Sequence, residues 1–509
     1  MERFIRSLKN DIRVVKNWFI RMDSHERILF LLLVCYISYF TLASFLRYDS
    51  FYTGRFDLGN MVQAIWNTSQ GRILAASDDV GITSRLAYHA DFFLAFLAPF
   101  YLLWPHPKFI LFFQTVILAL GAVFVYKLST HILHRKTISL VFAASYLLNP
   151  SIQRSNLYDF HAVVLATTFL LGAFYFMKLR RYRWFLLFAF LAGSTKEEVW
   201  AIVGLFGLFI FSRAFYSLRA ARKEFLPYLK KELQFGIVVT ILSFATFYLF
   251  LSVIIPSFHG KEHFATAFFT DYGDNPSNIA TGILSSPIKV FGVITDESRR
   301  TYLRQLLLPI GYLSVFSPLY LFFALPDLLI NLLSKNANFQ QIYYQYTATI
   351  TPFLYIAGIY GVRLIRYFSP KISLTILSLY LLVMAVYGAY LYGPLPFSKN
   401  PNLAMFIRPR PNSVTIESFL QTIPQDAVIA ANNQLGSHLS ERRVIHTLPV
   451  GLDQSTYVLF LLSDSTATPS MQANRDMADR MRNDPNYILL FEDGDFLAFK
   501  KNRLSYLLY

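Results

Sequence analysis

Long apolar runs recur along the chain, and they constrain its fold more than any other feature. Several approach the roughly 20 residues that a helix needs to cross a bilayer, beginning with 28–46. Lipid offers the backbone no hydrogen-bond partners, so such runs must form helices. Only 15% of the 509 residues are charged, against about a quarter in soluble domains. The sequence therefore predicts a mainly α-helical, polytopic protein of the cell membrane.

The net charge of +16 comes largely from Lys and Arg in short segments between the apolar runs. This placement is a topology signal and argues against binding of nucleic acid. Residues 1–27 are predicted to form an amphipathic, cytoplasmic lead-in. The later basic clusters share the cytoplasmic side with it only if the short run 92–104 does not cross the membrane, so we expect that run to lie in the interface or to re-enter. These clusters are 127–136, 178–183, 213–231 and 363–371.

With this topology, residues 28–392 form a membrane module of about eleven spans, with long outer loops at 47–107 and 256–301. The turn around 194–198 carries charges between two runs that are each too short to cross alone. Such a turn is tolerated only where it lines an enclosed or wet cavity. The predicted spans are 28–46, 108–126, 137–149, 162–177, 184–195, 199–212, 235–255, 302–316, 318–333, 350–366 and 372–392.

A small α/β domain is predicted after the last span, on the extracytoplasmic side. Prolines mark 393–411 as a linker, and residues 412–509 form the domain. The acidic turn at 492–495 favours a hairpin. Strands are expected at 427–431, 443–447, 457–462, 487–491 and 496–500, and helical stretches near 413–421 and 470–483.

Acidic and histidine residues gather on the outer side of this topology. Each has a structural alternative; Asp57, for example, could cap a helix. Charges at membrane depth are expensive, however, and point to function. A partly desolvated carboxylate could act as a general base on a hydroxyl, and carboxylates with imidazoles could hold a divalent cation. The groups are Asp57, His89 with Asp91, Asp159 with His161, and Lys196 with Glu197 and Glu198.

Two tyrosines, Tyr343 and Tyr346, precede a predicted span on the same side. Such residues most often form an interfacial aromatic belt; the alternative is a stacking surface for a sugar ring or a contact for a lipid carrier. No HExxH, Walker A or serine nucleophile motif occurs in a suitable context, which argues against an ATP-driven machine and a zinc protease.

The chain resembles the prokaryotic membrane-protein family called domain of unknown function 2079 and, more broadly, the GT-C superfamily of membrane glycosyltransferases. The matching segments are 56–59, 89–91, 158–161, 196–198, 346–353 and 435–440.

The resemblance implies a GT-C-like fold and a sugar donor linked to polyprenyl phosphate, which enters from the bilayer. It implies an extracytoplasmic glycan, lipid or protein as acceptor. By position, Asp57 would be the general base, and Asp159 and His161 would form the second acidic site. The other polar residues and the two tyrosines would bind substrate, with Lys196, Arg85 or Arg154 available to the carrier phosphate.

Some GT-C members bind a metal at the second acidic site, and others do not. This chain lacks a paired-carboxylate motif there, so Mg²⁺ or Mn²⁺ stays open as a cofactor, with Asp57, Asp159 and His161 as the available ligands.

Two other functions stay open at this point. The acidic cluster could be an ion or proton site of a transporter or flippase, although the hydropathy repeat that many transporters carry is not found. The chain could also be a receptor or assembly scaffold that binds through its terminal domain.

Overall fold

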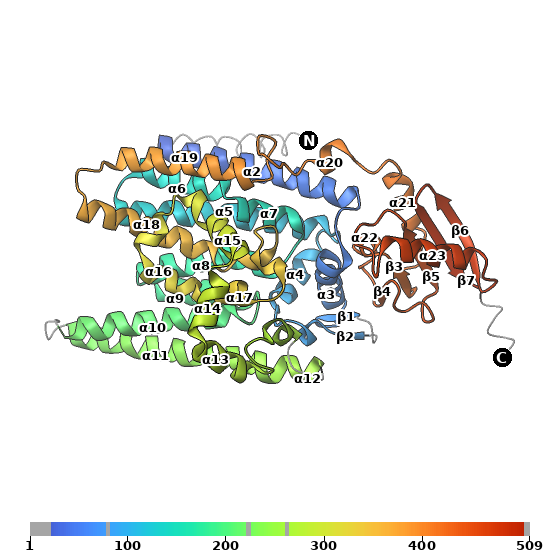
Figure 1. Ribbon diagram of the computed structural model, residues 1–509, viewed down its shortest axis with the longest axis horizontal. Helices are drawn as coiled ribbons and strands as arrows, with labels where there is room; N and C mark the ends of the chain where they lie inside the picture. Colours follow the sequence, from blue (N-terminus) through green and yellow to red (C-terminus); the bar gives the residue numbers. More distant parts are fainter. Residues whose placement is uncertain (1–21, 78–81, 220–224, 260–263, 503–509) are drawn as a thin grey trace, which may run out of the picture.

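The computed structural model describes residues 22–77, 82–219, 225–259 and 264–502. A long bundle of helices lies beside a small five-stranded sheet (Figure 1). The predicted cytoplasmic lead-in falls mostly outside the described residues, since the first described helix, α2, begins at Ser24.

Six described helices are long and apolar enough to cross a membrane. Asp23 caps the first of them, because its carboxylate accepts from the amides of His25 and Glu26. A bent pair, α13 (Pro276–Ser285) and α14 (Pro287–Ile294), would raise the number to seven. The six are α2 (Ser24–Asp49), α5 (Lys108–Leu133), α10 (Val199–Leu218), α11 (Leu226–Leu249) with its extension to His259, the helix Gln345–Phe368 that contains α18 (Thr351–Phe368), and α19 (Leu374–Tyr392).

The sequence predicts about eleven spans, and the helix lengths support fewer. Three predicted spans are helices of 13, 17 and 12 residues: α6 (Lys136–Leu148), α8 (Ala162–Lys178) and α9 (Tyr182–Gly193). α8 is almost wholly buried by other helices, so its apolar sequence reflects packing against protein.

The predicted spans 302–316 and 318–333 are also broken. α15 (Glu297–Leu307) ends before a turn at Gly311, whose φ of +61° is left-handed and favours glycine. The second run consists of α16 (Pro318–Leu321), a short 3-10 turn and α17 (Leu325–Leu333).

The long loop after α2 is folded into short elements. α4, at nine residues, is about 14 Å long, less than the thickness of a hydrocarbon core. The run 92–104 thus contains a helix that is shorter than a membrane span. The elements are the π-helical turn η1 (Arg55–Gly59), α3 (Asn60–Ser69), the hairpin β1 (Ala75–Ser77) and β2 (Ile82–Ser84), the turn η2 (Arg85–Ala87), and α4 (Phe93–Tyr101).

Residues 413–502 form an α/β unit around a sheet in the order β4-β3-β5-β7-β6. β3 pairs in parallel with β4 and β5, and β7 pairs antiparallel with β5 and β6. The strand ends lie within two residues of those that the sequence predicts. The strands are β3 (Ile429–Ala431), β4 (Ile445–Thr447), β5 (Tyr457–Leu461), β6 (Tyr487–Asp493) and β7 (Phe496–Lys501).

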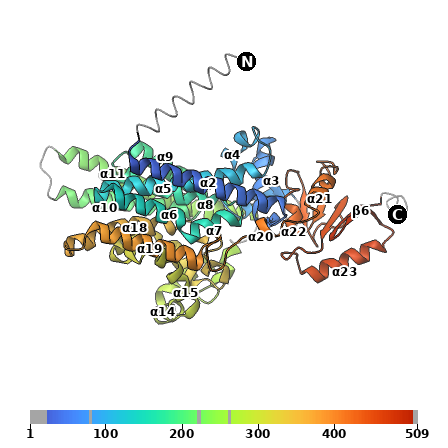
Figure 2. The same cartoon turned by 90° about the horizontal axis from the view of Figure 1, so that it is seen from above.

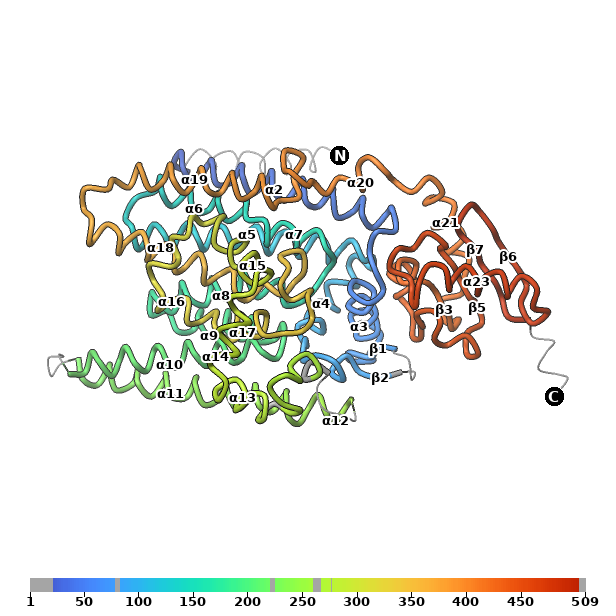
Figure 3. The backbone as a smooth tube through the Cα atoms, in the orientation of Figure 1, coloured from blue at the N-terminus to red at the C-terminus, as the bar shows by residue number. Residues whose placement is uncertain are grey.

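Apolar side chains cover both faces of this sheet. α21 (Ser413–Leu420) packs through Ile416 on one face, and α23 (Met471–Arg482) packs through Ala478 and Met481 on the other. Figure 2 shows the two helices on opposite sides of the strands. The chain reaches this unit from α19 through the short helix α20 (Ala404–Ile407) (Figure 3).

The α/β unit is docked on the loop after α2, and this contact brings strand β4 to the helical bundle. The His438 ring lies between Tyr48 and Phe51, with ring centroids 4.0 and 3.9 Å away. The backbones also approach closely: a Cβ on Gly436 of α22 (Asn433–Gly436) would lie 2.5 Å from Cβ of Arg55. The hydroxyl of Ser77 bonds both the amide and the carbonyl of Ile445 in β4.

Candidate active site

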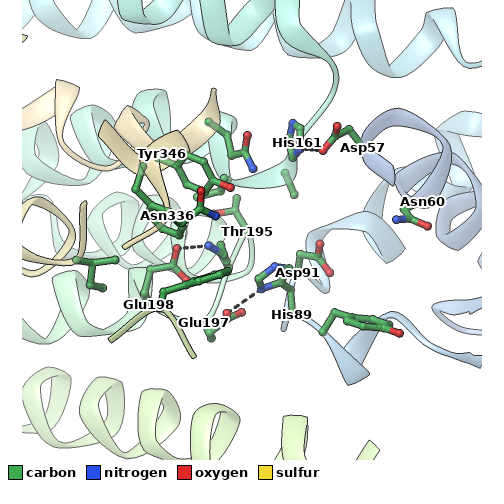
Figure 4. Close-up of a pocket in the computed structure, with 18 of the residues that line it drawn as sticks. Asp57, Asn60, His89, Asp91, His161, Thr195, Glu197, Glu198, Asn336 and Tyr346 are labelled. Carbon is green, nitrogen blue, oxygen red and sulfur yellow. Dashed lines mark hydrogen bonds and ion pairs between the residues drawn. The ribbon is translucent and has the colours of Figure 1, made fainter. Parts of the chain in front are cut away.

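A cavity of about 720 Å³ lies where the loop after α2, the turn before α10, α17 and β4 meet. Most of the polar residues that the sequence singles out line it, as do several that it does not. Figure 4 shows His161 beside Asp57, and Glu197 facing His89. The charged and imidazole side chains that line it are Arg55, Asp57, Arg85, His89, Asp91, His161, Lys196, Glu197, Glu198, Asp327 and His446.

Two hydrogen-bond donors at the end of helix α7 (Pro150–Tyr158) hold Asp57. Tyr158 is the last residue of the helix, and His161 follows it. Nε2 of His161 lies 3.0 Å from Oδ1 of Asp57, and the Tyr158 hydroxyl donates to Oδ2 at 2.8 Å. Burial raises the pKa of Asp57, but these hydrogen bonds and the charges of His161 and Arg85 outweigh it, so the pKa lies below its ordinary value. Asp57 is therefore a carboxylate at neutral pH, with about a quarter of its side chain (26%) exposed.

Asp159 does not line the cavity; it lies behind Asp57. Its carboxylate accepts from the Gly54 amide at 3.0 Å and pairs with Arg47 at 3.3 Å. Burial raises its pKa, against the opposing charge of Arg47. These bonds fix the turn that carries Asp57, so Asp159 is placed to position that residue and does not face a ligand.

His89, Asp91 and Glu197 form a second polar group across the cavity. Glu197 accepts from the amide of Ala90 and lies 2.9 Å from Nδ1 of His89, which ties the loop to the turn before α10. Burial lowers the pKa of His89 to about 3, so the ring is neutral at physiological pH. Arg85 pairs with Asp91 at 2.9 Å, and burial nonetheless raises the pKa of Asp91.

Lys196 and Glu198 pair at 2.7 Å, with about a fifth of each side chain exposed. They belong to the turn between α9 and α10, where each flanking helix is held by the bundle. Burial lowers the pKa of Lys196, but Glu198 and Glu197 raise it above its ordinary value overall. The sequence prediction that this charged turn lines a cavity matches its position here.

Of the two tyrosines predicted to bind substrate, one lines the cavity and the other does not. Tyr346 lines the cavity, with its ring stacked on Phe339 at 4.1 Å. Tyr343 lies outside it, under the guanidinium of Arg154 at 4.1 Å. Arg154 also lies outside the cavity and donates to the carbonyls of Tyr392 and Gly393, so it is not placed to meet a ligand phosphate there.

Within the part of the chain that the structure describes, no group of three His, Cys, Asp or Glu side chains is placed to hold a metal ion. Asp57 already accepts from His161 and Tyr158, and Asp159 pairs with Arg47. This donor set does not fit a divalent cation between Asp57, Asp159 and His161, because the carboxylate oxygens of both aspartates are turned toward protein donors and Nε2 of His161 is turned toward Asp57.

The sequence predicts no role for three further residues that line the cavity, Asp327, Arg55 and His446. Asp327 is 5% exposed and stands in α17, inside an apolar run, which is itself the signal that could have identified it. Arg55 is 3% exposed, and burial lowers its pKa to about 9. His446 has no comparable signal, because only the docking of β4 brings it to the cavity.

One wall of the cavity is apolar. α11 contributes Phe247, its π-helical extension contributes Leu251, and α13 contributes Ile279 and Ile283. In the long helix Leu226–His259, which contains α11, only 11% of the most apolar 18-residue stretch is buried by the rest of the protein. The cavity thus joins a wall of carboxylates and imidazoles to helices with exposed apolar surface.

Helices able to span a bilayer, folded around a buried charged cavity, define a polytopic membrane protein with a candidate enzyme site. The chain belongs to the family described as "Predicted membrane protein (DUF2079)", which matches residues 47–502. This match confirms the resemblance to this family that the motifs indicate.

Among solved structures, the chain is similar to oligosaccharyltransferases of the archaeon Archaeoglobus fulgidus. The apo enzyme aligns with a TM-score of 0.40 and 13% identity, over 84% of this chain and 69% of that one. AglB in complex with an inhibitory peptide and a dolichol-phosphate aligns with a TM-score of 0.40 and 11% identity, over 93% and 74%. No curated protein matches the sequence.

Proposed function

We propose that this protein is a membrane glycosyltransferase that moves a sugar from a polyprenyl-phosphate carrier to an acceptor on the extracytoplasmic side. The observation that carries the proposal is the cavity itself, where a fixed carboxylate, Asp57, shares one space with an apolar wall. The likeness of the motifs around Asp57 and His161 to the GT-C superfamily supports the same assignment.

The apolar wall suits a lipid-linked donor. Phe247, Leu251 and Ile283 can contact a prenyl chain, while the polar side holds the sugar and phosphate. Further along the bent helix pair, Leu284 and Ile288 are 82% and 88% exposed, so apolar surface continues beyond the cavity. A prenyl chain that leaves the cavity would therefore meet further apolar surface.

Asp57 is the proposed general base. The acceptor oxygen forms a bond to the anomeric carbon while the bond from that carbon to the carrier phosphate breaks, and the phosphate leaves with the electron pair. The acceptor proton passes to the Asp57 carboxylate, whose orientation His161 and Tyr158 fix. Arg85, whose charge reaches Asp57, lines the cavity and supplies the positive charge for the departing phosphate.

The proposed topology follows the charges of the sequence. The N-terminus is cytoplasmic, 393–411 is a linker, and the domain from residue 412 is extracytoplasmic in the cell membrane. The domain would then close the acceptor side, because Ile445, His446 and Thr447 of β4 line the cavity.

The test uses the purified chain in lipid nanodiscs with polyprenyl-phosphate carriers bearing radiolabelled sugars, and a membrane extract from cells lacking the chain as acceptor. We expect transfer of label, and a loss of about 100-fold or more in Asp57→Asn, the range for removal of a general base. Asp49→Asn is the matched control, since Asp49 pairs with Lys108 outside the cavity and is 49% exposed.

Full transfer by Asp57→Asn would overturn its role as base. Failure of every donor, together with movement of labelled lipid across proteoliposome membranes, would instead favour the flippase alternative.

A further inference from the structure

The end of the cavity around Lys196 contains more negative than positive groups. Glu197, Glu198 and Asp327 line it together with this one lysine. All four are close enough to affect one another electrostatically. Glu198 forms an ion pair with Lys196, at 2.7 Å.

The neighbouring histidine does not remove the imbalance. His89 lies 2.9 Å from Glu197, but its pKa falls to about 3 because it is buried, so it contributes no charge at neutral pH. Burial and the charges of Glu197 and Asp327 raise the pKa of Glu198 above its ordinary value, against the opposing charge of Lys196. The carboxylates around this lysine therefore favour a further positive charge beside them.

Asp327 adds an observation independent of the charge count. It is 5% exposed and hydrogen-bonded to Thr349, which also lines the cavity. Its Oδ2 has no hydrogen-bond partner within the described ranges. A buried carboxylate oxygen without a donor is costly, and in a cavity wall the missing donor is expected from a ligand.

We propose that Asp327, with Glu198 and Glu197, forms a subsite for an ammonium group, and that the sugar transferred by this protein is an amino sugar. The second half rests on the proposed function; the subsite itself does not. An ammonium group has three N–H donors and a positive charge, whereas a hydroxyl has one donor and no charge. It therefore both fills the free oxygen of Asp327 and balances the excess carboxylates.

The test is ligand-dependent thermal unfolding of the purified full chain in detergent at neutral pH. The probes are the methyl glycosides of glucosamine, glucose and N-acetylglucosamine, which differ only in the group at one carbon. We expect the glucosamine glycoside to raise the melting temperature and the two neutral glycosides to raise it little. Asp327→Asn should weaken glucosamine binding by about tenfold or more, as for a lost charged hydrogen bond; Asp49→Asn, outside the cavity, should leave it unchanged.

Lys196→Met is a second variant, and its expected effect on the affinity for the glucosamine glycoside is opposite to that of Asp327→Asn. Removing the resident ammonium leaves the carboxylates less neutralised, so glucosamine should bind more tightly. Equal stabilisation by glucose and glucosamine, or unchanged glucosamine binding in both variants, overturns the subsite. Glucosamine binding that depends on Asp327 in a chain without transferase activity would sink the proposed function and leave the subsite standing. Transfer of neutral sugars only, unaffected by Asp327→Asn, would support the proposed function and overturn the amino-sugar subsite.

Discussion

Nε2 of His161 lies 3.0 Å from Oδ1 of Asp57, although 104 residues separate them in the chain. The second oxygen of the same carboxylate accepts from Tyr158, so two donors fix its orientation. The α7–α8 junction supplies both donors, and the loop after α2 supplies the acceptor. The carboxylate is thus oriented before any ligand arrives.

Tyr158→Phe should shift the pH dependence of transfer. The Tyr158 hydrogen bond is one of the interactions that lower the pKa of Asp57 below its ordinary value, so its loss raises that pKa. The acid limb of kcat/KM should therefore move to higher pH, by up to about one unit. Tyr380→Phe, which removes a hydroxyl bonded to Gly311, is the control. An unmoved acid limb would show that Asp57 does not govern the rate.

Glu197→Ala should loosen the loop that carries His89 and Asp91. The buried amide of Ala90 loses its acceptor, a cost of about 1–3 kcal/mol. Glu197→Gln keeps an oxygen for this amide and should cost less. Hydrogen exchange at Ala90, measured by mass spectrometry, checks this; equal protection in all three proteins would contradict it.

Gly436→Ala should disturb the docking of the C-terminal unit. Its Cβ would lie 2.5 Å from Cβ of Arg55, a contact that no flexible side-chain end can relieve. We expect a loss of about 1–3 kcal/mol, typical of overpacking, and reduced transfer because β4 forms part of the cavity wall. In the control, Gly292→Ala, the new methyl group meets no atom within 4 Å. A Gly436→Ala protein with unchanged melting temperature and activity would argue that the unit is not a wall of the site.

Glu417 should make the same docking sensitive to acid. Burial raises its pKa, but the hydrogen bond and charge of His438 outweigh this, so the pKa lies below its usual value of 4.5. A lowered pKa means stability that is present above pH 4.5 and is lost as pH falls through the folded-state value. The melting temperature of the native protein should therefore fall more steeply below about pH 4.5 than that of Glu417→Gln. If the melting temperatures of the two proteins fell in parallel with pH, the pair of Glu417 and His438 would not stabilise the fold.

Much of the local structure could be predicted from the sequence. Strands β3 to β7 and helices α21 and α23 follow from alternation and turn residues, and their ends lie within two residues of expectation. The short run 92–104 contains a nine-residue helix, α4. These properties depend on neighbours in the chain, which the sequence contains directly.

The number of spans could not be predicted as well. An apolar run indicates burial, but it does not distinguish burial in lipid from burial in protein. The apolar run of α8 illustrates burial in protein, because its 17 residues are enclosed almost entirely by other helices.

For the site, the amino-acid sequence by itself determined most of the titratable residues that line the cavity, namely Asp57, His89, Asp91, His161 and the charged turn 196–198. Only the tertiary structure decided their partners. It placed Asp159 behind Asp57, left Tyr343 outside, and added Asp327 and His446. The physical reason is that residue type fixes the available charge and hydrogen bonds, whereas the direction of each side chain depends on packing between segments far apart in the chain.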